Sequence, residues 1–196
     1  MGKKDLNELI KSTLNESAEI KKRVAEECSL EIIRAVDIIS NCLKNGKKIM
    51  LCGNGGSAAD CQHIAGELVV RLTSKRNRNA LPAIALTTDT SIITACSNDY
   101  GFDYIFSRQV EALGNEGDVL IGISTSGNSQ NVINAIEKAK QKNIKTVALL
   151  GAGGGKIKGM SDVDIIIPSD HVCRIQEAHN TIGHIICDLV ERMVFE

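Results

Sequence analysis

Apolar residues in the first 44 positions recur at helical spacing, with no Gly or Pro between residue 3 and Gly46. Two stripes make up this pattern: Leu6, Leu9, Ile10 and Leu14, then Ile32, Ile33, Val36, Ile39 and Leu43. The 3.6-residue period predicts a helix over residues 5–44, with Gly46 as its C-terminal cap. A small sheet offers such an arm little apolar surface, so we expect it to pack against another subunit.

Short apolar runs replace the helical spacing after Gly46. Strands are predicted at 49–52, 83–86, 119–123, 146–150 and 163–167, and helices at 57–72, 101–114, 129–142, 155–160 and 173–195. Apolar strands separated by helices are typical of a parallel sheet covered on both faces. We therefore predict an α/β fold with a five-stranded, doubly wound, flavodoxin-like sheet over residues 46–196, preceded by an N-terminal helical arm over residues 1–45.

Composition narrows the class of protein. The 196 residues are 43% hydrophobic and carry a net charge of −1 without a basic block, which argues against a nucleic-acid partner. No apolar run approaches the roughly 20 residues that span a bilayer, and the N-terminus does not resemble a signal peptide, so we expect no membrane partner. The seven scattered cysteines form no CxxC pair, which favours reduced thiols in the cytoplasm, with Cys52 and Cys187 in the core.

A hydroxyl-rich loop follows the predicted strand 119–123. Its hydroxyls are those of Ser124, Thr125, Ser126 and Ser129, and a helix-periodic stretch begins directly after them. Unpaired amides and the dipole at a helix N-terminus favour an anion. Because the loop contains no Lys or Arg, it is suited to the phosphate of a small metabolite. The alternative is that Asn128 merely caps the helix, while the glycine-rich run 151–155 reads as a plain turn.

A second loop, from Gly53 to Ser57, also joins a strand to a helix. Gly53, Gly55 and Ala58 satisfy a dinucleotide-binding pattern, but the acid expected about 20 residues later is missing, since the next strand ends near Asp89. We expect instead that the loop supplies donors to a polyol.

Ionisable residues occur on two of the predicted helices. His63 and Glu67 are four residues apart and share a helix face, as metal ligands, an acid–base pair or an ordinary surface pair would. On the last helix, Gln176 and His184 lie about 12 Å apart along the axis and differ in direction by about 80°. They can bind one ion only if their side chains lean toward each other or if different subunits supply them. The alternative is that His184 is a core residue, as histidines on apolar helices usually are.

The ordered motifs of the whole chain resemble one family. The motifs are CGNGGSAAD (52–60), His63-x-x-x-Glu67-Leu, Ser97-Asn-Asp-Tyr-Gly-Phe102, Phe106-Ser-Arg-Gln-Val-Glu-Ala112, Gly122-Ile-Ser-Thr-Ser-Gly-Asn-Ser129 and Arg174-Ile-Gln-Glu-x-His179. Together they resemble the phosphoheptose (sedoheptulose 7-phosphate) isomerases of the sugar isomerase (SIS) class. The resemblance implies a homotetramer with active sites between subunits. It also implies one zinc ion per subunit, held by His63, Glu67, Gln176 and His184.

The same resemblance implies the substrate and its contacts. Those contacts are Asn54, Gly55, Gly56, Ser57, Glu67, Asn98, Asp99, Ser124, Thr125, Ser126, Ser129 and Gln176. The expected reaction converts D-sedoheptulose 7-phosphate to D-glycero-D-manno-heptose 7-phosphate through an enediol. Glu67 is the candidate base, and either zinc or His184 is the electrophile. Cys173 departs from the family, since some relatives have an acid there, and the role of that acid is therefore in doubt here.

Two other functions remain open at this point. A SIS domain can act as a non-catalytic sugar-phosphate sensor, and a tetrameric relative binds a replication-initiator protein. The chain could also isomerise another phosphosugar, because the loops do not specify carbon number, anomer, or whether the ADP- or GDP-heptose formed downstream supplies lipopolysaccharide or capsule. The presence of His63, Glu67, Gln176 and His184 together favours catalysis.

Overall fold

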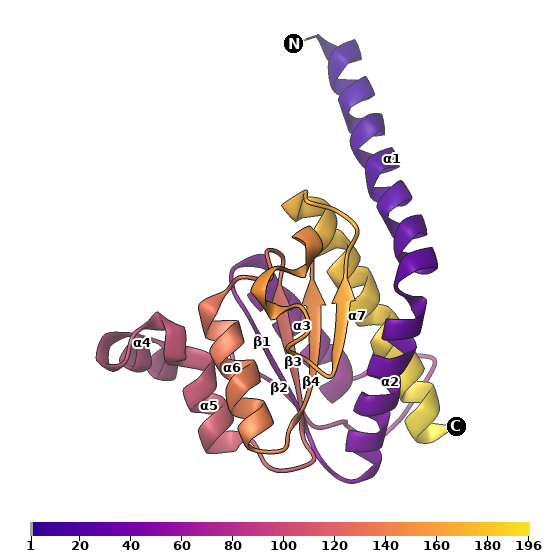
Figure 1. Ribbon diagram of the computed structural model, residues 1–196. Helices are drawn as coiled ribbons and strands as arrows, with labels where there is room; N and C mark the ends of the chain where they lie inside the picture. Colours follow the sequence, from indigo (N-terminus) through magenta and orange to yellow (C-terminus); the bar gives the residue numbers. More distant parts are fainter. Residues whose placement is uncertain (1) are drawn as a thin grey trace.

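Five parallel strands stand at the centre of the computed structural model, which describes residues 2–196 (Figure 1). The strands are β1 (Ile49–Gly53), β2 (Ala83–Ala85), β3 (Val119–Ser124), β4 (Lys145–Leu150) and β5 (Val163–Ile166). Their spatial order is β2-β1-β3-β4-β5 and every pair is parallel, which confirms the predicted flavodoxin-like sheet. The winding reverses between β1 and β3, where Gly53 is opposite Ile123. The loops that follow these two strands therefore leave the sheet side by side.

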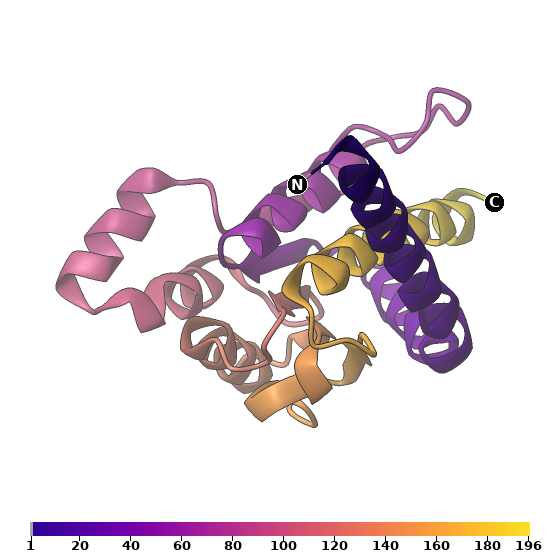
Figure 2. The same cartoon turned by 90° about the horizontal axis from the view of Figure 1, so that it is seen from above.

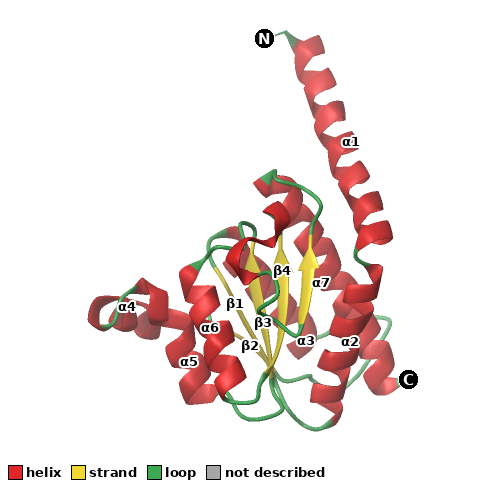
Figure 3. Cartoon of the chain, viewed as in Figure 1, coloured by secondary structure: helices red, strands yellow, loops and turns green. Residues whose placement is uncertain are grey.

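Helices cover both faces of the sheet, as Figure 3 shows. On one face lie α2 (Ser29–Lys44), α3 (Gly56–Val69) and α7 (Val172–Phe195), and on the other lie α5 (Ile105–Leu113) and α6 (Gln130–Gln141). Successive strand residues point to opposite faces. Accordingly, Leu51 of β1 is buried under the first layer and Met50 under the second. The two layers thus share one sheet but form two separate cores.

The N-terminal segment consists of two helices, so the prediction of one unbroken helix over residues 5–44 is wrong. α1 (Lys3–Glu27) and α2 are separated at Cys28, whose φ of −119° and ψ of −1° depart from helical geometry. The Cys28 side chain is buried, and its thiol donates to the carbonyl of Ile166 at 3.4 Å. The break turns α2 onto the sheet while α1 projects beyond the body of the molecule (Figure 1). At the other end of α2 the C-cap is Asn45, one residue before the predicted Gly46, which follows it with a φ of +68°.

A helix that the hydrophobic pattern did not indicate, α4 (Thr90–Asp99), follows β2. Asp89 caps it by accepting from the amide of Ile92 at 2.9 Å. Its only buried residue is Cys96, which explains why it lacks a clear apolar stripe. A 3₁₀ turn η1 (Phe102–Tyr104) then leads into α5, so the predicted helix over 101–114 is shorter than expected. Figure 2 shows α4 standing apart from α7, and Cys96 of α4 belongs to the core on the face that α5 and α6 cover.

The last predicted short helix, 155–160, is an irregular turn. It is η2 (Ala152–Ile157), in which three successive glycines from Gly153 have positive φ. No helix within residues 2–196 is long and apolar enough to cross a membrane. Cys52 and Cys187 are core residues as predicted, and burial raises the pKa of both thiols to about 12. The division of the chain at residue 45 stays a prediction.

Candidate active site

The serine loop follows β3 and opens α6. Ser124 is 3% exposed, and its hydroxyl lies 3.0 Å from that of Ser129, the residue before α6. Asn128 does not cap α6. Its side-chain amide donates to the carbonyl of Ser126 at 2.8 Å, and its Oδ1 accepts from the amide of Lys156 at 3.1 Å. No side chain caps the first amides of α6, which leaves them available to an anion.

The glycine-rich turn η2 supports the serine loop from behind. A Cβ at Gly127, whose φ is +64°, would overlap the carbonyl of Gly154, and a Cβ at Gly155 would collide with the carbonyl of Ser126. Only glycine at these positions permits such a close approach of two backbones. The interpretation of residues 151–155 as a plain turn therefore missed a structural role. The serine loop depends on this contact for its shape.

The glycine loop after β1 is joined to α6 by a pair of amides. Asn54 and Asn131 exchange two hydrogen bonds of 2.9 Å, each donating to the other, and Asn131 is 2% exposed. Ser57, in the first turn of α3, is 4% exposed. The sequence analysis missed Asn131, although an asparagine in the first helical turn beside a binding loop is a usable signal. The pairing brings the two candidate substrate loops into one assembly.

His63, Glu67 and His184 come together between α3 and α7. The Nε2 atoms of the two histidines are 2.6 Å apart, with their rings at 78° to each other. Oε1 of Glu67 lies 3.5 Å from Nε2 of His63. His63 and Glu67 share a helix face as expected. α7 adds His184 because it runs alongside α3, with Gly56 beside Gln176 and Ile64 against Gly183.

The donor set of this cluster fits a zinc ion. Two imidazole nitrogens and one carboxylate oxygen lie within 4.8 Å of one another, and zinc takes these ligand types. Gln176 is about two helical turns before His184 on α7, and its amide lies against Gly56. Its role as a ligand stays a prediction. Asn98 and Asp99 are exposed at the end of α4, where the amide of Asn98 donates to Asp99 at 2.8 Å.

Asp60 is a further polar residue on α3 that sequence reasoning did not single out. Its Oδ1 accepts from Asn180 of α7 at 3.4 Å, and its buried Oδ2 has no hydrogen-bond partner within residues 2–196. Burial raises the pKa of this carboxyl group, although the Asn180 contact and the neighbouring His63 oppose the shift. Its i, i+3 spacing from His63 was the signal that could have found it.

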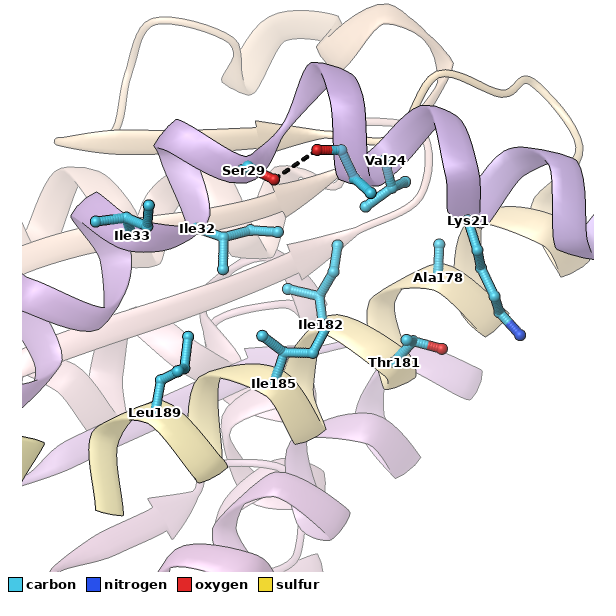
Figure 4. Close-up of a pocket in the computed structure, with 11 residues that line it drawn as sticks. Lys21, Val24, Ser29, Ile32, Ile33, Ala178, Thr181, Ile182, Ile185 and Leu189 are labelled. Carbon is cyan, nitrogen blue, oxygen red and sulfur yellow. Dashed lines mark hydrogen bonds between the residues drawn. The ribbon is translucent and has the colours of Figure 1, made fainter. Parts of the chain in front are cut away.

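An apolar groove lies on another part of the surface, between α7 and the junction of α1 with α2 (Figure 4). It has a volume of about 230 Å³, and its walls carry Val24, Ile32, Ile182 and Ile185. Of the described residues that line it, only Lys21 is charged. A sugar phosphate needs several hydrogen-bond partners, so this groove is unsuited to the substrate and suited to another apolar surface.

Comparisons with known proteins agree with this arrangement. Residues 14–151 match the SIS domain family. Phosphoheptose isomerase of Pelodictyon phaeoclathratiforme is 53% identical over 188 residues, covering 95% of this chain and 89% of the relative. That of Aquifex aeolicus is 53% identical over 189 residues, covering 96% and 98%. The solved phosphoheptose isomerase of Neisseria gonorrhoeae superposes with a TM-score of 0.89 at 44% identity, covering 95% of this chain and 99% of that chain. The chain belongs to the phosphoheptose isomerase family of SIS-domain proteins.

Proposed function

We propose that the chain is an aldose–ketose isomerase that converts D-sedoheptulose 7-phosphate to D-glycero-D-manno-heptose 7-phosphate. The observation that carries this proposal is the His63–Glu67–His184 cluster, on two helices that start at the edge of the sheet where the serine loop lies. An isomerisation through an enediol needs a phosphate anchor, a base and an electrophile, and all three kinds of group are present. A non-catalytic sensor would need only the first, so that alternative is not favoured.

The serine loop is the proposed phosphate anchor. Ser124, Thr125, Ser126 and Ser129 offer hydroxyl groups, and the first amides of α6, which follow Ser129, have no side-chain cap. Such neutral donors bind a phosphate dianion with the help of the helix dipole. Because the phosphate is remote from the reacting carbons, its binding energy can orient the opposite end of the sugar. The glycine loop, from Asn54 to Ser57, would contact the hydroxyl groups between these ends.

Proton transfer is assigned to the cluster. Glu67 would remove a proton from one of carbons 1 and 2 and return it to the other. Where His184 and not zinc is the electrophile, His184 would protonate the carbonyl oxygen of one carbon and recover a proton from the hydroxyl group of the other as the new carbonyl forms. His63, Glu67 and His184 would hold a zinc ion with Gln176, and zinc when bound supplies a Lewis acid that polarises a carbonyl oxygen. A carboxylate held tightly by a metal is a weaker base. Either Glu67 changes its coordination during turnover, or the base and ligand roles belong to different groups.

A homotetramer with sites between subunits is the proposed assembly, located in the cytoplasm. Three features support it. The apolar stripe of α1 is exposed, from 43% at Leu6 to 65% at Leu14, and the groove beside α7 is apolar as well. Asn98 and Asp99 are on α4, which stands apart from α7 (Figure 2). A second copy would cover the stripe and could bring the predicted contacts on α4 to the site.

Substitution of the base tests the proposal. We expect Glu67→Gln to abolish exchange of the C1 proton of the substrate in deuterated water, because an amide cannot accept that proton. Inhibition by inorganic phosphate should stay within about threefold of wild type, since the serine loop is unchanged. Glu137→Gln, an exposed glutamate on α6, is the matched control and should exchange normally. Retained exchange in Glu67→Gln would remove Glu67 as the base, and an unchanged rate after chelation would remove zinc from the reaction.

A further inference from the structure

A buried ion pair lies at the far end of the α3–α7 contact, away from the serine loop. Arg78 comes from the segment between α3 and β2, and its side chain is 1% exposed, while that of Glu191 on α7 is 0% exposed. Nε of Arg78 donates to Oε1 of Glu191 at 2.7 Å, and Nη2 lies 2.6 Å from the same oxygen. A guanidinium so deeply buried is kept only where its donors are satisfied.

The guanidinium of Arg78 also reaches the backbone of one member of the His63–Glu67–His184 cluster. Nη2 donates to the carbonyl oxygen of Glu67 at 2.8 Å, and Nη1 donates to the carbonyl oxygen of Asn79 at 2.9 Å. α3 ends at Val69, so the carbonyl of Glu67 is in the last turn, where no helical amide follows to bond it. Arg78 therefore caps α3 at the very residue that carries the candidate base.

Glu191 fixes the other side of the pair. It is seven residues after His184 on α7, which places both on one stripe of the helix. It also accepts from the amide of Leu72 at 3.1 Å and from Arg76 at 2.9 Å. Burial alone would raise the pKa of Glu191, but these donors and Arg78 lower it, so the carboxylate is charged. The pair joins the last turn of α3 to the stripe of α7 that carries His184.

We propose that Arg78 is a positioning residue for the isomerase reaction, and that with Glu191 it sets the distance between the Glu67 carboxylate and His184. The inference rests on the function proposed above. The two helices are already in contact at Gly183, where an added Cβ would lie 2.9 Å from Ile64. That contact lies one turn before Glu67 on α3 and does not act on Glu67 itself. The bond from Arg78 acts directly on the backbone of Glu67, the residue whose carboxylate must face His184.

The test compares Arg78→Lys and Arg78→Gln with wild type. Lysine keeps the charge but cannot donate to Glu191 and to the Glu67 carbonyl in the same planar fork. We expect kcat to fall about 10- to 100-fold in Arg78→Lys, which is the usual effect of removing a residue that orients a metal ligand. The KM for the sugar phosphate should change less than about threefold. Zn²⁺ affinity, measured by titration, should fall by a similar factor. Arg192→Gln is the control, because among residues 2–196 Arg192 hydrogen-bonds only to Asp188, its neighbour on α7.

The outcomes separate this inference from the proposed function. Wild-type levels of kcat and Zn²⁺ affinity in folded Arg78→Lys would overturn the positioning role and leave the isomerase assignment intact. Wild-type protein that does not isomerise the sugar would instead remove the proposed function. In that case the ring ¹⁵N chemical shifts of His63 and His184, recorded without metal or substrate, would test whether Arg78 positions the cluster. Shifts that change in Arg78→Lys and not in Arg192→Gln support the proposal, and unchanged shifts contradict it. If Arg78→Gln does not fold, Arg78→Lys gives the same readouts.

Discussion

His179 is a buried histidine whose protonation should weaken the fold. Its side chain is 0% exposed on α7, where Nε2–H donates to the carbonyl oxygen of Leu150 at 3.1 Å and Nδ1 has no partner within residues 2–196. Burial lowers its pKa to about 4, against a partial opposing effect of the Leu150 contact. The unfolded chain, with a histidine pKa of about 6.5, therefore binds this proton at a higher pH than the folded chain does.

The sign and size of the effect follow from this difference. The contribution of neutral His179 to the free energy of unfolding is fully present above pH 6.5. It decreases as the pH falls below that value and is fully lost below pH 4. A difference of about 2.5 pKa units corresponds to about 3 kcal/mol in total, of which about 2 kcal/mol is lost by pH 5. Protonation of carboxylates with lowered pKa values, such as Asp118 and Glu191, lowers the free energy of unfolding further, mainly below pH 5.

Urea denaturation at pH 8, 7, 6 and 5, followed by circular dichroism at one protein concentration, measures the effect. His179→Gln is the informative variant, because a neutral amide can still donate to Leu150 but does not titrate. Wild type should lose about 2 kcal/mol more than His179→Gln between pH 8 and pH 5. His171→Gln, at an exposed histidine, should follow wild type. Parallel curves for wild type and His179→Gln would refute the assignment of a depressed pKa to His179.

Two further predictions concern the serine loop and the assembly. Gly127→Ala should weaken inhibition by inorganic phosphate at least tenfold, because its Cβ would overlap the glycine-rich turn. Gly153→Ala has a similar positive φ but open space, and should keep wild-type inhibition; equal inhibition in both would contradict the steric argument. Leu9→Glu and Leu14→Glu should dissociate the proposed tetramer in sedimentation experiments, whereas Lys11→Glu adds an acid to α1 outside that stripe and should not. Wild type that sediments as a monomer would remove the tetramer.

The sequence predicted the sheet well because each strand is a short apolar run bounded by loop residues. It predicted the N-terminal helices and α4 less well. The break at Cys28 depends on a contact with Ile166, which is 138 residues away, and no local pattern reports such a contact. α4 is polar on most sides because it packs against little of its own chain. Hydrophobic periodicity detects a helix only through the surface that it buries.

Within the site, each loop was predictable, and the contacts between loops were not. Asn54 was singled out for its place in a glycine loop, but its partner Asn131 lies 77 residues later. Likewise, the five-residue glycine run after β4 looks like a flexible turn when read alone. Its structural role becomes clear only in the folded chain, where a side chain at Gly155 would collide with the backbone of Gly127. Tertiary contacts between small polar residues leave no periodic signal in the sequence.

The pairing of α3 with α7 could have been inferred by one more step from the predicted topology. Both helices follow parallel strands, so both begin at the carboxyl edge of the sheet, and they lie on the same face. Residues that are equally many positions from the start of each helix should then lie beside each other. His63 is seven residues after Gly56, and His184 is eight after Gln176, a difference of about 1.5 Å along the axis. The same rule separates Gln176 from His184 by about 12 Å along the axis of α7. An ion bound by all four predicted ligands would therefore require either that these two long side chains lean together or that a second copy of the chain supplies one of them.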